Sequence, residues 1–131
     1  MATEETNLQN EELDALGIDS KTIAEIRAKA DSLIDEKEGI DVVYPIVIKG
    51  NPRRRDKELY VGYFREPNFK MFSKYLVAST QNQAGAMRNL ARDIFIDGDK
   101  ELVDKDSLFL FGLMGQLSKI IEMRNGALIN L

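Results

Sequence analysis

Two short runs of β-branched and aromatic residues, separated by a turn, constrain the fold of this chain more than any other feature. The first run spans residues 40–49 and the second spans residues 58–65, with a glycine, proline and arginine turn at 50–56. This order predicts a β-hairpin in which Pro45 occupies an edge strand or a bulge. Because a two-stranded hairpin is only marginally stable alone, we expect helices or another sheet to cover its apolar face.

Apolar residues at helical spacing predict helices on both sides of the hairpin. The expected helices span about residues 21–37, 69–79, 83–96 and 106–123. Asp19-Ser20 and Asn68 are of residue types that favour the N-cap, and they precede the first and second of these helices,. The third shows the clearest amphipathic stripe, which includes Phe95. The predicted fold class is therefore α+β, with an N-terminal helix, a β-hairpin and then three helices packed on the hairpin.

The chain length and its acidic start predict one domain preceded by an arm. At 131 residues the chain has room for a single core,. Residues 1–19 are acidic and lack aromatic side chains, so they bury too little apolar surface to offset their ordering entropy,. We expect an acidic mobile arm at 1–19 and a single α+β domain at 20–131.

The absence of cysteine and histidine narrows the possible functions. It excludes disulfides, thiolate metal sites and every catalytic triad built on histidine. No catalytic residue, metal site or cofactor is therefore expected, and an enzyme is disfavoured. The net charge of −4 argues against general nucleic-acid binding,. With no bilayer-spanning segment and no secretory signal, we expect a protein of the cytoplasm.

The last predicted helix is apolar nearly all round, which leaves two interpretations open. Either it is a central helix covered on several sides, or part of it faces a protein partner. Gly112 and Gly115 allow close approach of another backbone and fit both interpretations. The predicted partner-binding residues are Leu108, Phe109, Phe111, Leu113, Met114, Leu117 and Ile121.

A cluster of arginines lies at the predicted hairpin tip. Arg53, Arg54 and Arg55 are consecutive, and Lys57 is nearby. Such a tip suggests contact with a polyanion or with an acidic protein surface, whereas a solvated turn is the plainer interpretation. A single tip provides too few phosphate contacts for tight nucleic-acid binding.

The segment from Asp93 to Asp104 resembles a calcium-binding loop only in part. Carboxylates at the first, fifth and twelfth positions, with Gly98 at the sixth, match the loop pattern,. Phe95 occupies the third position, and the twelfth is an aspartate in place of the bidentate glutamate. We therefore expect a helix end followed by a polar turn, without a metal ion.

The order of elements resembles that of the small tail assembly chaperones of long-tailed bacteriophages. The matching parts are the strand and Arg-x-Pro motif at Leu59–Pro67, the helix at 84–95, the Asp97-Gly98-Asp99 turn and the apolar helix at 108–121. The resemblance covers about residues 40–125, so the arm and the first helix lie outside it. It implies a non-enzymatic protein that self-associates and coats the apolar, helical tape-measure protein during virion assembly.

Two functions follow from the sequence as predictions. The first is a phage or prophage tail assembly chaperone-like protein that binds an apolar helical partner through the last helix. The alternative is a small nucleic-acid-binding regulatory protein that uses the Arg53–Arg55 tip.

Overall fold

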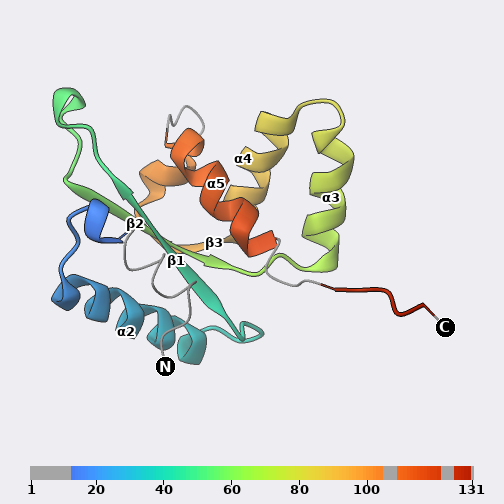
Figure 1. Ribbon diagram of the computed structural model, residues 1–131, viewed down its shortest axis with the longest axis horizontal. Helices are drawn as coiled ribbons and strands as arrows, with labels where there is room; N and C mark the ends of the chain where they lie inside the picture. Colours follow the sequence, from blue (N-terminus) through green and yellow to red (C-terminus); the bar gives the residue numbers. More distant parts are fainter. Residues whose placement is uncertain (1–12, 105–108, 122–125, 131) are drawn as a thin grey trace.

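A computed structural model describes residues 13–104, 109–121 and 126–130 of the chain (Figure 1). Its helices and strands are α2 (Ser20–Glu36), β1 (Val43–Lys49), β2 (Leu59–Arg65), α3 (Phe69–Ser79), α4 (Gln83–Ile94), β3 (Phe95–Gly98) and α5 (Leu110–Ile121). Residues 13–15 are also helical, and short 3-10 turns lie at Pro52–Arg54 and Lys100–Val103. This order of elements confirms the predicted α+β class and the helix, hairpin and helices sequence.

The strands form one antiparallel sheet in the order β1-β2-β3. In the hairpin, Val43 lies opposite Arg65 and Lys49 lies opposite Leu59. Pro45 is exposed and lies in β1, which is an edge strand. Proline has no N–H to donate to a second neighbouring strand, so an edge position suits it. The hairpin extends well beyond the sheet, so that its tip projects from the body of the molecule (Figure 1).

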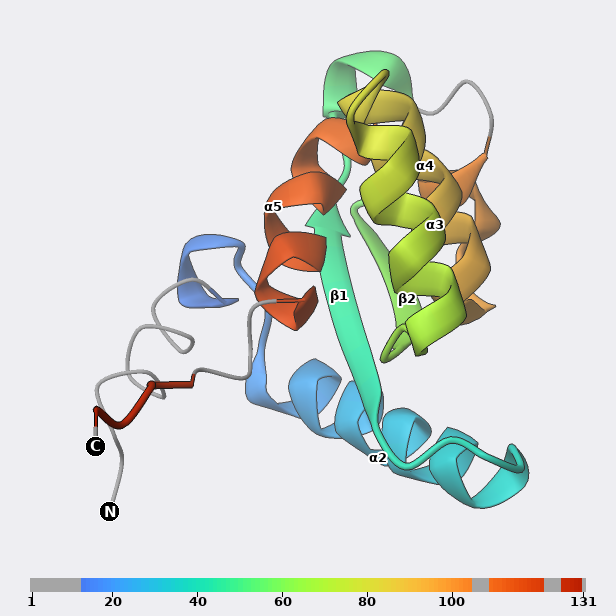
Figure 2. The ribbon, with the colours of Figure 1, turned by 90° about the vertical axis from the view of Figure 1, so that its right-hand side faces the viewer.

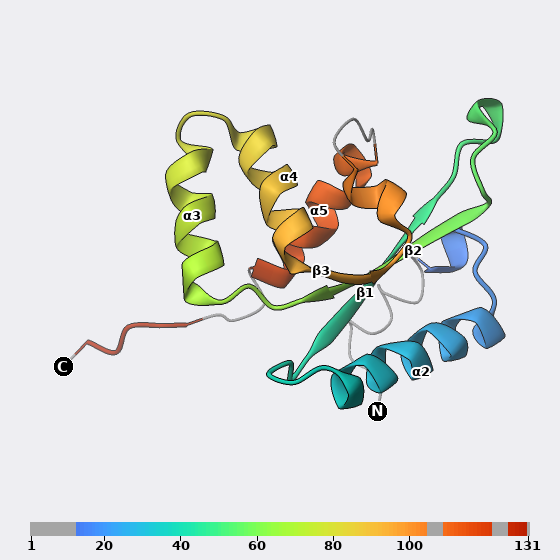
Figure 3. The ribbon, with the colours of Figure 1, turned by 180° about the vertical axis from the view of Figure 1, so that it is seen from behind.

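Helices cover both faces of the sheet, and the alternation of side chains along the strands divides the core in two. Helix α2 lies on one face, whereas α3, α4 and α5 lie on the other (Figures 2 and 3). Ile46 of β1 and Phe64 of β2 pack with residues of α4 and α5, while Val43 of β1 and Tyr63 of β2 pack with Leu33 of α2. Because successive side chains of a strand point to opposite faces, each strand contributes to two apolar clusters, one on each face of the sheet.

The third strand corrects the prediction for residues 95–98. The apolar stripe predicts a helix to about residue 96, but α4 ends at Ile94 and the chain continues as β3. Phe95 then packs on the α4–α5 side of the sheet and Ile96 packs on the α2 side. This alternation of side chains and the hydrogen-bonded pairing with the edge of β2 favour a strand here,. The helical spacing in the sequence reflects only residues close along the chain, so it does not include this pairing.

Local capping explains where two of the helices begin. The Asp19 carboxylate accepts a hydrogen bond of 2.7 Å from the Thr22 N–H at the start of α2. The Asn68 side chain accepts one of 2.9 Å from the Met71 N–H at the start of α3. Both residues are the predicted N-caps.

Most of the predicted arm lies outside the described residues. Its first twelve residues are not described, and within the remainder Ile18 is buried with 8% of its surface exposed. The mobility of residues 1–19 therefore stays a prediction. In the part of the chain that the structure describes, none of the helices is both long enough and apolar enough to cross a membrane.

Candidate functional site

The structure places the central residues of α5 in the core. Leu113 and Leu117 have no exposed surface, and Ile120 is 6% exposed. These side chains pack with Phe64 and Leu90 between the sheet and α4. Leu113 and Leu117 are therefore core residues, and their prediction as partner-contact residues is wrong for this conformation. Of the two interpretations left open for this helix, central burial describes them.

The other predicted contact residues of the last helix are only partly described. Met114 is half-buried against the core, and the ring of Phe109 stacks on that of Tyr60 at a centroid distance of 4.5 Å. Leu108 lies outside the described residues, as do the side chains of Phe111 and Ile121. What the structure describes of α5 therefore includes no exposed large apolar side chain.

Helix α3 carries the apolar surface that α5 was predicted to provide. Phe69 is 86% exposed, Val77 is 73% exposed and Leu76 is 50% exposed, and α3 contains no buried residue. Phe72, which is half-buried, continues the row at a spacing of three residues from Phe69. We call Phe69, Phe72, Leu76 and Val77 the α3 ridge. Large apolar side chains gathered on one helix face, unlike single scattered ones, mark a contact surface.

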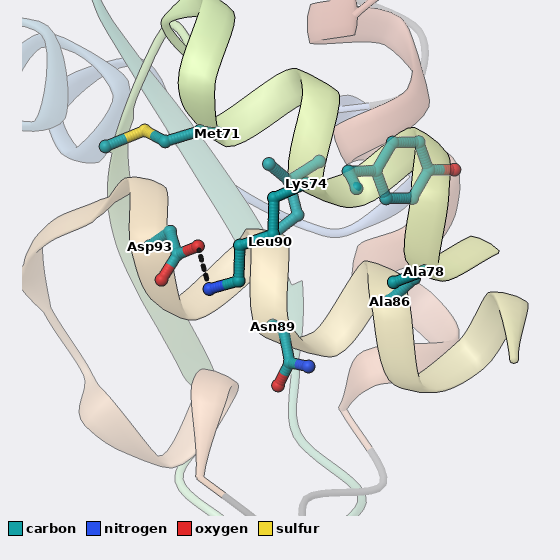
Figure 4. Close-up of a pocket in the computed structure, with 8 residues that line it drawn as sticks. Met71, Lys74, Ala78, Ala86, Asn89, Leu90 and Asp93 are labelled. Carbon is teal, nitrogen blue, oxygen red and sulfur yellow. Dashed lines mark hydrogen bonds and ion pairs between the residues drawn. The ribbon is translucent and has the colours of Figure 1, made fainter.

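The opposite face of α3 is fixed by packing on α4. Met71, Tyr75 and Ala78 face Ala86 and Leu90 across a shallow groove between the two helices (Figure 4). An ion pair closes one part of this groove. The Lys74 Nζ lies 3.3 Å from an Asp93 carboxylate oxygen. Apolar packing and this cross-link hold α3 in place, so the ridge on its other side is presented to solvent.

The helix pair that carries the ridge has a positive formal charge although the chain as a whole is acidic. Helix α3 carries Lys70 and Lys74 and no carboxylate, and α4 adds Arg88 and Arg92 against Asp93 alone. Four basic and one acidic residue give the α3–α4 pair a charge of +3. Residues 1–41, in contrast, hold 12 acidic and 4 basic residues, a charge of −8, within a total of −4. The ridge therefore lies on a helix pair of positive charge, in a chain whose negative charge is concentrated in residues 1–41 of the sequence.

The hairpin tip is the second exposed feature that the sequence singled out. Arg53, Arg54 and Arg55 are all exposed, and Arg55 has a left-handed backbone with φ of 59°. Figure 1 places the tip and α3 at opposite ends of the molecule. The arginine tip and the α3 ridge are therefore two separate surfaces.

The aspartates of the calcium-like segment pair with separate lysines. Lys29 lies 3.2 Å from Asp97, and Lys57 forms an ion pair with Asp99, while Asp93 pairs with Lys74 as described above. Within the described residues there is no group of three or more side chains that could hold a metal ion. The expected helix end is found at Ile94, but the segment after it is a strand.

The same pairings set the pKa values of two of these carboxyls. Hydrogen bonds from the Gly98 N–H and from Lys29 hold the pKa of Asp97 below its ordinary value. Burial raises the pKa of Asp99, but hydrogen bonds from Lys57 and from the Val61 N–H outweigh it and keep that pKa low,. Both groups therefore act as ionised links between elements.

Sequence reasoning missed the α3 ridge although a signal for it was present. Phe69, Phe72, Leu76 and Val77 lie on one side of the predicted helix, and Met71 and Tyr75 lie on the other. A surface helix of a small domain needs only one apolar stripe, which packs on the core. A second stripe on the same helix therefore indicates a second contact surface. The same rule that singles out the last helix therefore also singles out residues 69–79,.

No protein-family model, curated protein or solved structure matches the chain. The resemblance to tail assembly chaperones stays a prediction.

Proposed function

We propose that this protein is a non-enzymatic, assembly chaperone-like protein that covers an apolar helix of a protein partner with the α3 ridge. The observation that carries the proposal is the exposure of Phe69, Leu76 and Val77 on a helix that buries none of its own residues. The contact surface proposed from the sequence, on α5, moves to α3 because the central residues of α5 lie in the core.

The spacing along the ridge suits a helical partner. Phe69, Phe72 and Leu76 follow the i, i+3, i+7 spacing by which one helix packs along another, and Val77 widens the row,. Aromatic anchors such as Phe69 contribute most to such contacts when they enter a pocket of the partner. A helix with an apolar stripe is therefore the expected occupant.

The charge of α3 and α4 indicates which residues should flank the apolar stripe of the partner helix. Lys70 is exposed beside the ridge, and the α3–α4 pair has a charge of +3. Carboxylates flanking the apolar stripe of the partner would be attracted, whereas lysines would be repelled. The proposed occupant is thus an amphipathic helix with acidic flanks.

A designed peptide tests this surface directly. The probe is a fluorescent helical peptide of about three heptads, with leucine at two positions per heptad and glutamate at the flanking positions. We expect the double variant Phe69→Ser, Val77→Ser to bind it at least about tenfold more weakly than the unaltered chain in fluorescence anisotropy. The free energy of unfolding should change little, because both side chains are largely exposed,.

A matched control removes similar apolar surface elsewhere. Leu128 and Ile129 are 91% and 79% exposed, so Leu128→Ser, Ile129→Ser leaves the ridge intact. This control should bind the probe as the unaltered chain does, and a peptide with lysine flanks should bind more weakly than the one with glutamate. Equal binding by the ridge variant and the unaltered chain would contradict the proposal.

The phage assignment, in the cytoplasm of a bacterial host and with a tape-measure type partner and self-association, is a separate part of the proposal. It rests on the resemblance over residues 40–125 and on the exposed apolar surface that such a partner needs. Tail-tube and tape-measure genes beside the gene for this chain would support it. Neighbouring genes of an unrelated pathway would oppose it without affecting the peptide experiment.

A further inference from the structure

The arginine tip is built on a well-ordered turn. The Asn51 N–H donates to an Asp56 carboxylate oxygen at 2.9 Å, and the Asn51 side chain accepts from the Arg53 N–H at 3.0 Å. The Arg54 N–H donates to the Asn51 carbonyl at 3.0 Å, and the Arg55 N–H donates to the Pro52 carbonyl at 3.3 Å. These bonds hold the backbone of the turn in one arrangement before any ligand arrives, which lowers the backbone entropy lost on binding.

Two charged groups beside the arginines have other partners. Asp56 is used by the backbone of the turn, and Lys57 forms its ion pair with Asp99. Over the described residues, none of the ion pairs involves Arg53, Arg54 or Arg55. Residues 49–58 contain five basic and two acidic residues, so the tip has a charge of +3.

The backbone at Arg55 argues against a turn shaped only for solubility. Its φ of 59° lies in the left-handed region, which glycine and asparagine adopt far more readily than arginine,. A turn without a binding role would be relieved of this strain by glycine. Backbone strain of this kind clusters at functional sites, so it accords with a binding role for the turn.

We infer that the Arg53–Arg55 tip is a recognition site for a short acidic segment of a protein. Guanidinium groups bind carboxylates through two parallel hydrogen bonds, so three of them suit a segment with two or three glutamates or aspartates. A nucleic acid fits less well. It would extend past the tip along a molecule in which the described residues 13–41 hold eight acidic and four basic residues, a charge of −4, and that charge would repel the phosphates,.

The site is separate from the α3 ridge, because the two lie at opposite ends of the molecule (Figure 1). It stands whether or not the ridge binds a helix. A partner with both an apolar helix and an acidic segment would be held at two points, which strengthens binding without further contacts.

Fluorescence anisotropy with a labelled peptide of about six glutamates tests the site at low salt, near 0.02 M. The triple variant Arg53→Gln, Arg54→Gln, Arg55→Gln should bind at least about tenfold more weakly than the unaltered chain. The triple variant Lys21→Gln, Arg27→Gln, Lys37→Gln alters three exposed cations outside the tip and makes the same change in net charge. It should keep most of the affinity.

Two further probes decide between specific recognition and simple attraction. Replacing the three arginines by lysine retains the charge and should still weaken binding, because lysine lacks the paired donors. A labelled DNA duplex of about 20 base pairs should bind no more tightly than the peptide. Absence of peptide binding at low salt, equal loss in both glutamine variants, or tighter binding of the duplex would each overturn the inference. Unchanged urea midpoints confirm that the variants are folded.

Discussion

Leu113→Ala is expected to lower the free energy of unfolding by about 3 kcal/mol. Leu113 has no exposed surface and packs in the cluster between the sheet, α4 and α5. Removing three buried carbon atoms costs roughly 2.4 kcal/mol at about 0.8 kcal/mol each, and the cavity left behind adds to this loss. Since a domain of this size is stabilised by about 5–15 kcal/mol, the variant should fold but melt roughly 10 °C lower.

Urea unfolding followed by circular dichroism measures this loss, and Val77→Ala provides the control. Val77 is 73% exposed on α3, so its truncation should change the free energy of unfolding by less than about 0.5 kcal/mol,. The opposite assignment, with α5 as the exposed surface, requires a small loss for Leu113→Ala. A loss below about 1 kcal/mol would therefore refute the placement of α5 in the core. For the same reason Leu113→Asp tests folding and not association.

Three further predictions concern glycines, acid and the hairpin tip. Gly98→Ala should destabilise the fold by more than about 2 kcal/mol in urea unfolding, because φ is 112° and a Cβ would lie 2.4 Å from a β2 carbonyl oxygen,. Gly115→Ala should instead stabilise it by about 0.5–1 kcal/mol, since nothing lies within 4 Å,; a loss of stability would show that this face is covered. The pKa values of Asp97 and Asp99 are lowered in the folded state. The two carboxylates therefore contribute to the free energy of unfolding above about pH 4, the ordinary pKa, and this contribution is lost as the pH falls through the lowered values,. The urea midpoint should fall in that range, and Asp99→Asn should flatten the dependence. Arg55→Gly should raise the melting temperature because it relieves a φ of 59°, and an unchanged or lower value would contradict the strain,.

Much of the local structure could be predicted because its causes lie within a few residues. The N-caps Asp19 and Asn68 and the edge position of Pro45 follow from side-chain chemistry that acts over one turn or one strand,. The hairpin follows from two apolar runs around one turn. For these features, chain order and residue type are sufficient.

The third strand could not be predicted in the same way. Residues 95–98 continue a helical apolar stripe in the sequence, yet they pair with β2, whose residues lie about 30 positions earlier,. The free edge of β2 and the two apolar clusters that receive Phe95 and Ile96 exist only once the sheet has formed. Strand formation here is a consequence of tertiary pairing.

The sequence by itself determined that this chain has more apolar helix surface than a small domain needs. The tertiary structure decided where that surface lies. Residues 69–79 and 110–121 are both apolar on more than one side, but α5 packs against β1 and α4, which buries Leu113 and Leu117. The packing of α3 on α4 covers one side of α3 and leaves Phe69 and Val77 exposed. A helix pattern records which faces are apolar, whereas burial depends on which neighbours the fold brings to each face.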